Sequence, residues 1–322
     1  MIKLTNDHAI GQDLRDACCE ALIEEARRDE RIVAVNCDLR SSMGLKPFAK
    51  EFPDRELNVG IMECNGCGMA GGMSAAGLIP FFATFAAFAT RRVYDQIFLS
   101  CAYSKLNVKI LGGDAGITAT SNGGTHMPFE DMGILRVMPG VTVMEPSDAV
   151  MMKSLIHEMA NTYGVQYLRF NRKGNHSLYE PGSSFTIGKG VVLRDGTDVT
   201  LIANGLMVYE ALLAAQTLAN EGVSARVVDM FTIKPLDEEL VVDSAARTGA
   251  IVTAENHQVI GGLGSAVAEV LAEKRPTVLE RVGIHDEFGE VGTQAYLAER
   301  FKLNAAEIVR AARQALARKA QA

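Results

Sequence analysis

One acidic residue in the first quarter of the chain stands where it could act on a bound molecule. Glu63 follows the largely apolar run 59–62 and precedes a segment rich in glycine, alanine and methionine. A carboxyl group in apolar surroundings can act as an acid or a hydrogen-bonding group at neutral pH. A glutamate in the first turn of a helix is the other interpretation, because it interacts favourably with the helix dipole. The spacing alone leaves both open.

Two phenylalanines and a histidine follow at positions that could serve a bound ring. Phe85 and Phe88 are three positions apart, which places both on one face of a helix start. There they could stack on a planar ring or belong to a core. His126 stands between a glycine-rich stretch and Pro128, so it could project into a cleft as a proton donor or polar clamp. A single histidine is equally compatible with a structural role.

Cys64 and Cys67 form a C-x-x-C pair, a pattern that occurs in zinc and redox sites. A structural zinc site needs a second pair of ligands at matching spacing, and the sequence offers none. We therefore expect reduced, mostly buried thiols and no metal site in this chain.

A glycine-rich stretch in the second half has a structural interpretation. The segment 261–265 is similar to a dinucleotide-binding loop but lacks the third glycine and the downstream acid. It predicts a tight turn from a strand into a helix. The preceding residues Glu255, Asn256 and His257 end that strand, and the sequence assigns them no role.

The elements that position these residues are clearest in the second half. Strands are predicted at 199–203, 225–230, 250–254 and 277–282, and helices at 207–221, 237–247 and 264–274. Strands that alternate with helices of about 10–15 residues indicate βαβ units and a parallel sheet covered on both faces.

The first half alternates less regularly. Helices are predicted at 13–28, 66–77 and 85–103, and strands at 32–36, 80–84, 109–112 and 142–145. Between the last two strands runs a connection rich in glycine, threonine and asparagine, residues 112–127. A long irregular connection inside a compact domain is usually functional.

The chain therefore predicts an α/β fold with two doubly wound domains. The boundary falls in the polar stretch 173–188, which contains glycine, serine and proline. We place the domains at 1–180 and 188–322.

Composition excludes some classes of partner. Hydrophobic residues make up 48% of the 322 residues, charged residues 22%, and the formal net charge is −7. This balance argues against nucleic-acid binding, which needs clustered lysine and arginine. No apolar run reaches the roughly 18 residues that span a bilayer, and the N-terminus lacks the pattern of a signal peptide. We expect a cytoplasmic protein with no nucleic-acid or membrane partner.

Several short motifs occur in a characteristic order along nearly the whole chain. They are VGIxE at 59–63, TFxxF at 84–88, GGTH at 123–126, LRxxR at 168–172, DVTLIANG at 198–205, IKPLD at 233–237, AENH at 254–257 and GGLGSA at 261–266. This ordered set resembles the pyrimidine-binding and C-terminal domains of transketolases, as found in the C-terminal subunit of two-subunit transketolases. The resemblance implies a pyrimidine-binding fold followed by a transketolase C-terminal domain.

The resemblance also implies an activity and a cofactor. Transketolases use thiamine diphosphate to transfer a two-carbon ketol unit from a ketose phosphate to an aldose or aldose phosphate. The glutamate of VGIxE, here Glu63, would activate the cofactor by a hydrogen bond to N1′ of its aminopyrimidine. Phe85 and Phe88 would pack against that ring, and His126 would lie near the reacting oxygens of the substrate.

For the substrate phosphate, the resemblance implies contacts from Arg172, Arg15 and Ser42, since guanidinium groups and a hydroxyl suit a terminal phosphate. Two departures concern the sugar. Asn122 stands where the family has an aspartate that contacts a sugar hydroxyl, and the segment 111–114 lacks a histidine often found there. The substrate could therefore be a branched, deoxy or otherwise modified ketose phosphate.

One family motif is missing. Transketolases hold the diphosphate and its metal with a GDG motif followed by an asparagine, and this sequence has no GDG. The resemblance therefore implies an N-terminal partner subunit that carries the GDG…N motif and holds Mg²⁺ (or Ca²⁺), in an α2β2 assembly.

Two alternatives stay open. One is the β-subunit of a thiamine-dependent 2-oxoacid or acetoin dehydrogenase, which shares the split architecture and the activating glutamate. The GGTH loop and Arg172 favour a transketolase over it. The other is a non-catalytic subunit that kept the fold, against which Glu63, both phenylalanines and His126 argue.

Overall fold

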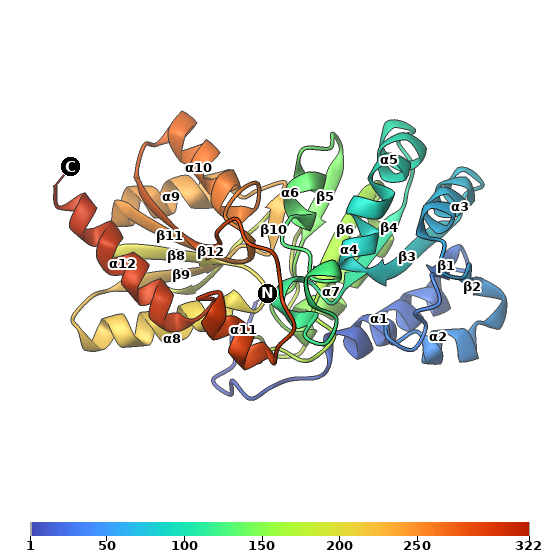
Figure 1. Cartoon of the computed structure of the whole chain (residues 1–322), viewed down its shortest axis with the longest axis horizontal. Helices are drawn as coiled ribbons and strands as arrows, with labels where there is room; N and C mark the ends of the chain where they lie inside the picture. The colour runs from blue at the N-terminus through green and yellow to red at the C-terminus, as the bar shows by residue number, and fades with distance from the viewer. Residues whose placement is uncertain (1, 322) are drawn as a thin grey trace.

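The computed structural model describes residues 2–321 and contains two sheets placed side by side (Figure 1). The strands are β1 (Ile32–Asn36), β2 (Glu56–Asn58), β3 (Ile79–Phe85), β4 (Lys109–Gly113), β5 (Val141–Met144), β6 (Val165–Phe170), β7 (Val191–Arg194), β8 (Val199–Ala203), β9 (Ala225–Asp229), β10 (Thr232–Lys234), β11 (Ala250–Gln258) and β12 (Val278–Ile284). The seven-stranded sheet has the order β10-β5-β6-β4-β3-β1-β2, and the five-stranded sheet has the order β12-β11-β8-β9-β7. Strands pair in parallel except β10 with β5 and β7 with β9.

Helices cover both faces of the sheets, which confirms the predicted α/β class. They are α1 (Leu14–Arg28), α2 (Lys46–Glu51), α3 (Glu63–Ala75), α4 (Ala86–Ala89), α5 (Tyr94–Gln96), α6 (Asp131–Arg136), α7 (Ala149–Asn161), α8 (Met207–Asn220), α9 (Glu238–Thr248), α10 (Leu263–Lys274), α11 (Gln294–Arg300) and α12 (Ala305–Lys319). Short 3-10 turns lie at Pro53–Arg55, Arg91–Val93, Gly116–Thr118 and Gly123–Thr125. Within residues 2–321, none of these helices has the length and apolar character needed to cross a membrane.

The central strands are buried on both faces, and this explains their sequences. In β8, Val199 and Leu201 pack into the core on the side of α8 and α12, whereas Ile202 packs into the core on the side of α9 and α10. A strand with helices on both sides needs apolar residues at every position instead of alternate ones. The run VTLIA therefore predicted this strand to the residue.

The predicted helix over 85–103 is wrong as a single element. The strand β3 continues through Phe85, and Thr90 has φ −129° and ψ −85°, outside the helical region. The hydroxyl of Thr90 donates to the carbonyl oxygen of Ala86 at 2.7 Å, and a π-helix occupies Ile97–Tyr103. This break leaves Phe88 in a short helix directly after the strand, at the carboxyl edge of the sheet.

The second half of the chain contributes to the first sheet. Strand β10 pairs antiparallel with β5, with Thr232 opposite Met144. The connecting segment is also ordered against the N-terminus, since Tyr179 bridges to Leu4 and His176 to Ile10. The two halves are therefore joined by a shared strand as well as by side-chain packing.

A buried carboxyl group links the two halves. Asp229 ends β9 and accepts hydrogen bonds from the hydroxyls of Ser147 at 2.5 Å and Tyr179 at 2.7 Å. Burial raises the pKa of Asp229 from 3.8 to about 7, although the two hydroxyl donors lower it. The folded protein thus holds a proton that the unfolded chain releases at lower pH.

The raised pKa of Asp229 predicts a pH-dependent stability. Because the pKa is higher in the folded state, the stabilisation is complete below the ordinary pKa and is lost as the pH rises through about 7. Asp229→Asn keeps an acceptor for both hydroxyls and has no proton to lose. We expect the unfolding free energy of this variant, relative to the native chain, to rise by about 2 kcal/mol between about pH 5 and pH 7. Denaturant titrations at both pH values measure it, and a difference independent of pH would mean that Asp229 is ionised in the folded state.

Candidate active site

The candidate residues gather at the carboxyl edge of the seven-stranded sheet. The register pairs Phe85 at the end of β3 with Gly113 at the end of β4, and Gly113 with Phe170 at the end of β6. Parallel strands present their carboxyl ends at one edge, where α/β proteins bind ligands. The segments that follow these strands, which carry Phe88, His126 and Arg172, therefore start side by side.

Glu63 is the first residue of α3, and its side chain is only 4% exposed. Its carboxylate accepts a hydrogen bond from the guanidinium of Arg92 at 2.8 Å. That guanidinium also lies over the ring of Phe88, 3.8 Å from the ring centroid. The position fits both sequence interpretations, because Glu63 is in the first turn of a helix and also next to the aromatic pair.

Arg92 was not identified from the sequence. It follows Phe88 by four positions, but the break at Thr90 means that no continuous helix joins the two residues. The partner carboxylate lies 29 positions away. Nothing in the local pattern joins the two.

Phe85, Phe88 and His126 form an aromatic cluster. The two phenylalanine rings lie 6.3 Å apart between centroids, and His126 lies edge-on to both, at 6.0 Å from Phe85 and 5.0 Å from Phe88. The Nδ1 atom of His126 is 2.8 Å from the hydroxyl oxygen of Thr125, which fixes the ring orientation. The structure thus brings together the three aromatic residues predicted from separate motifs.

A hollow opens beside this cluster. It has a volume of about 540 Å³ and is lined by Phe88, Arg91, Arg92, Thr125 and His126. A buried carboxylate, aromatic faces and an adjacent open hollow fit the planar, hydrogen-bonding aminopyrimidine that the resemblance implies. A negatively charged diphosphate with its metal needs a different set of groups. Within residues 2–321, no cluster of three or more His, Cys, Asp or Glu side chains could hold a metal ion.

Arg172 lies in a second hollow at the same edge. Its guanidinium forms a two-point ion pair with Asp114, in which Nε donates to Oδ1 at 3.1 Å and Nη2 contacts Oδ2. The same guanidinium is 5.6 Å from the centroid of the Phe85 ring. Asp114 is 8% exposed and has a left-handed φ of +57°. The pair therefore fixes the direction of the arginine fork.

This second hollow has a volume of about 360 Å³. Its lining includes Asn122, Arg172, Lys173 and Gln294. Lys173 and Gln294 were not singled out in the sequence. Lys173 follows the LRxxR motif directly, whereas Gln294 comes from α11 in the other half of the chain. Only folding brings Gln294 to this edge.

Arg15 and Ser42 lie in neighbouring segments, and neither is in the lining of the hollow that contains Arg172. The guanidinium of Arg15 pairs with Asp13 at 3.7 Å and with Asp16 at 3.5 Å. The turn after Ser42 presses on α1, since a Cβ atom at Gly44 would stand 3.0 Å from the carbonyl oxygen of Arg15. The two residues are therefore close to each other, and the start of α1 meets the Arg172 segment where Gly174 N–H donates to Asp13 at 3.2 Å.

The glycine-rich stretch has a structural role, and the two cysteines are free thiols. Cys67 is buried and Cys64 is exposed. The glycines at 261–264 form the predicted turn into α10. There Glu255 accepts the N–H groups of Leu263 at 2.7 Å and Gly264 at 2.8 Å, which caps the helix start.

Two family models match successive parts of the chain. The family model "Transketolase, pyrimidine binding domain" matches residues 11–175, and "Transketolase, C-terminal domain" matches residues 188–308. The chain is 50% identical to the 6-deoxy-6-sulfo-D-fructose transketolase subunit SqwH of Clostridium sp. (strain MSTE9), over 95% of each chain. It is 38% identical to a subunit of the apulose-4-phosphate transketolase of Phocaeicola vulgatus, over 85% of this chain and 88% of that protein.

Solved transketolase structures have the same fold as this chain. A split-gene transketolase, described as an inactive β4 tetramer, is 44% identical and superposes with a TM-score of 0.90, over 95% of this chain and 99% of that one. The transketolase of Leishmania mexicana is 22% identical with a TM-score of 0.82, and it matches 97% of this chain with 46% of its own length. The second likeness concerns the fold alone.

Proposed function

Because the chain belongs to the transketolase family, as the C-terminal subunit of a split transketolase, we propose that it supplies the activating carboxylate and the substrate-binding loop of a shared active site. One observation carries the proposal: Phe88 and His126, from distant segments, line one hollow at the carboxyl edge of the sheet, and Arg92 on its wall is bonded to the buried Glu63. The 2-oxoacid dehydrogenase and non-catalytic alternatives are not favoured by the relatives, which are named as transketolase subunits.

The residues around the first hollow have different roles in binding the cofactor and the substrate. Bound thiamine diphosphate supplies a nucleophilic carbon and an electron sink for the two-carbon unit. Glu63 would hold the aminopyrimidine by a hydrogen bond in which one proton lies between its carboxyl group and N1′, a contact for which Arg92 must release or share that carboxyl group. Phe85 and Phe88 pack against the ring. His126 binds the reacting oxygen of the substrate and holds a proton there.

The second hollow accepts the far end of the sugar. Asn122 contacts a hydroxyl, and Arg172 binds a terminal anion with the N–H groups of its guanidinium that are not bonded to Asp114. Arg15 and Ser42 are proposed as further contacts. We propose a ketose donor that carries a terminal phosphate or sulfonate, and an aldose or aldose phosphate acceptor. The relative named for 6-deoxy-6-sulfo-D-fructose supports the sulfonate, and the relative named for apulose 4-phosphate supports the phosphate.

The remaining parts of the site come from another chain. We propose that an N-terminal subunit with the GDG…N motif holds the diphosphate through Mg²⁺ (or Ca²⁺), in an α2β2 assembly in the cytoplasm. The absence of GDG from the sequence supports this, as does the inactive β4 tetramer of the split-gene relative. Within this chain, 1–180 serves as the pyrimidine-binding domain and 188–322 as the C-terminal domain.

The reaction is tested on the complex of both subunits with thiamine diphosphate and Mg²⁺. The donors are 6-deoxy-6-sulfo-D-fructose, D-fructose 6-phosphate and neutral D-fructose, and pyruvate serves as the 2-oxoacid. Ketol transfer from either anionic donor supports the proposal. Decarboxylation of pyruvate without ketol transfer contradicts it.

Arg172 should determine the preference for an anionic donor. Arg172→Ala removes the guanidinium that would donate to the anion, and hydrogen bonds to charged groups contribute about 1.5–3 kcal/mol. We expect KM for both anionic donors to rise by about 10–100-fold, with little change for D-fructose, because the contact is made in the bound and transition states alike. Arg172→Lys, which keeps the charge but loses the fork, should fall between. An equal loss with the neutral donor would show that Arg172 acts on the sugar or on the fold instead.

A further inference from the structure

The connection that carries Asn122 and His126 leaves the first sheet at Asp114 and returns at α6. It is held at both ends by consecutive residues of β11, a strand of the second sheet. From this arrangement we infer that Asn256 is a positioning residue for the substrate-binding loop 114–131. The inference rests on the proposed function of His126 and Asn122, and it assigns a task to the motif 254–257.

At the start of the loop, the side chain of Asn256 completes the backbone hydrogen bonds. Its Oδ1 atom accepts the N–H of Ile117 at 3.0 Å, and its Nδ2 atom donates to the carbonyl oxygen of Ala115 at 3.2 Å. The side chain is 1% exposed, so water does not replace these contacts. Between the two bonded residues, Gly116 has a φ of +55°, and a Cβ atom there would collide with the Asn256 amide. The backbone of residues 115–117 therefore lies against the Asn256 side chain and depends on it for two hydrogen bonds.

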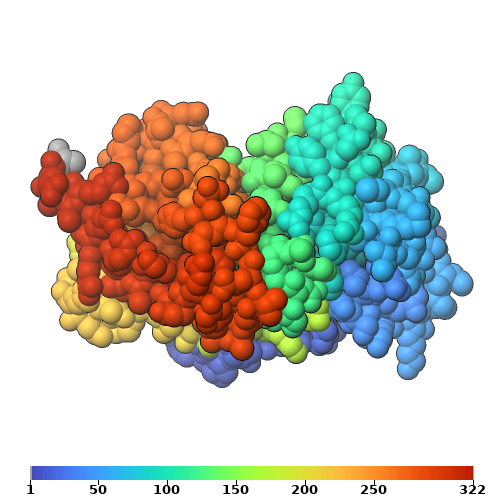
Figure 2. Space-filling model, viewed as in Figure 1, coloured from blue at the N-terminus to red at the C-terminus, as the bar shows by residue number. Residues whose placement is uncertain are grey.

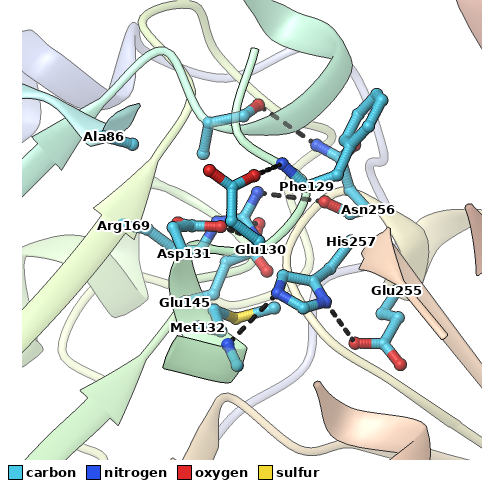
Figure 3. Close-up of polar contacts among 12 residues, drawn as sticks. Ala86, Phe129, Glu130, Asp131, Met132, Glu145, Arg169, Glu255, Asn256 and His257 are labelled. Atoms are coloured by element: carbon cyan, nitrogen blue, oxygen red, sulfur yellow. Dashed lines mark hydrogen bonds and ion pairs between the residues drawn. The ribbon is translucent and has the colours of Figure 1, made fainter. Parts of the chain in front are cut away.

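The end of the loop is bonded to the backbone of Asn256 and Gln258 and to the side chain of His257. The N–H of Gln258 donates to the carbonyl oxygen of Phe129 at 2.8 Å, and His257 Nε2 accepts the N–H of Gly133 at 3.2 Å. The buried guanidinium of Arg169 donates to the carbonyl oxygen of Asn256 at 3.0 Å and lies 3.2 Å from the carboxylate of Asp131 (Figure 3). Residues 256–258 thus hold both ends of the loop from a single strand.

The middle of the loop is held by other segments. There the N–H of Gly292 donates to the carbonyl oxygen of Thr120 at 3.2 Å, and Gly289 packs against Met127. The guanidinium of Arg91 also donates to the carbonyl oxygen of Thr125. Figure 2 shows the segment that carries these glycines, in orange and red, against the green loop on the surface. Asn122 is exposed and His126 is half-buried. The position of His126 relative to Phe88 therefore depends on Arg91 and on where the two ends of the loop are fixed.

The side-chain amide of an asparagine at position 256 matches the two backbone groups at the start of the loop. The loop presents one N–H and one carbonyl oxygen to the same side chain, and a neutral amide offers one acceptor and one donor in a fixed geometry. An unpaired buried backbone group is costly. Without the amide, the loop start must move toward water or toward another partner, and a shift of about 1 Å in a catalytic group can cost about 10²-fold in rate.

The test compares Asn256→Ala with Asn107→Ala in the complex of both subunits. Asn107 is also a buried asparagine whose side chain holds backbone, since its Oδ1 atom accepts the N–H of Gly164 at 3.1 Å. Asn107 and Gly164 precede strands β4 and β6, at the edge of the first sheet opposite the loop. We expect Asn256→Ala to lower kcat for 6-deoxy-6-sulfo-D-fructose by about 10²-fold, with an unchanged half-saturating concentration of thiamine diphosphate. Asn256→Asp, which keeps the acceptor for Ile117, should lose less. Asn107→Ala should keep kcat.

Amide hydrogen exchange of this chain gives a readout that needs no turnover. Asn256→Ala should accelerate exchange within 114–131 and leave α8 and α12 unchanged, whereas Asn107→Ala should leave the loop unchanged. If the native complex transfers no ketol unit from any donor, the proposed function fails, but faster exchange still supports the positioning role. A native kcat with native exchange in Asn256→Ala, or equal losses in the Asn107→Ala variant, would overturn the inference.

Discussion

Replacement of Glu63 by glutamine or alanine is expected to abolish ketol transfer by the complex while the chain keeps its fold. The carboxyl group is 4% exposed and bonded to Arg92 on the wall of the hollow beside Phe88, where it could share a proton with a bound ring. A glutamine has nearly the same size and can still bond to Arg92, but its amide cannot exchange a proton with the ring nitrogen. Loss of such a group costs about 10²–10⁴-fold in kcat.

Glu25 provides a matched control for this variant. It is also a buried glutamate on a helix, 5% exposed, and it pairs with Arg28 at 2.5 Å. It lies on α1 near His157, away from the aromatic cluster. Glu25→Gln should keep its turnover, and circular dichroism of both variants checks the fold. Near-normal turnover of Glu63→Gln would remove Glu63 from the mechanism.

The second large effect concerns the partner subunit. Purified alone, this chain should bind thiamine diphosphate weakly and give no turnover, and addition of the N-terminal subunit should restore both. The reason is chemical: Mg²⁺ binds several oxygen ligands in near-octahedral geometry, and the sequence lacks the GDG…N motif that supplies them in the family. The aminopyrimidine contacts alone leave the diphosphate in water.

Calorimetric titration with thiamine diphosphate and Mg²⁺ measures this effect, with and without the partner. The Glu63→Gln variant in the complex is the informative control, because it should bind the diphosphate end but not turn over. Full activity of the isolated chain would contradict the shared site, whatever its oligomeric state.

The two predictions concern different parts of one active site. The Glu63 variants test whether this chain activates the aminopyrimidine ring of the cofactor. The experiment with the partner tests whether a second chain binds the diphosphate. If turnover requires the partner but not Glu63, another group in the active site must activate the cofactor. A chain that needs Glu63 but no partner would place the diphosphate contacts within residues 2–321.

Much of the fold was predictable because it is locally encoded. The strands 32–36 and 199–203 were predicted to the residue, since strands buried on both faces need uninterrupted apolar runs. The helix over 85–103 was wrong as a single element, because the strand β3 continues through Phe85 and the backbone bends at Thr90. The strands β2, β6, β7 and β10 and the helices α2, α6, α7, α11 and α12 were not predicted.

The sequence by itself determined the family, the order of the domains and the residue types of the candidate site. Motifs such as VGIxE and GGTH are contiguous, so they can be read without knowing the fold. Only the tertiary structure decided how the residues meet. The pairs Arg92 with Glu63, Arg172 with Asp114 and Asn256 with Ile117 join residues 29, 58 and 139 positions apart. Such contacts form because the carboxyl ends of parallel strands share one edge and because a second sheet packs beside it, and no local spacing encodes either arrangement.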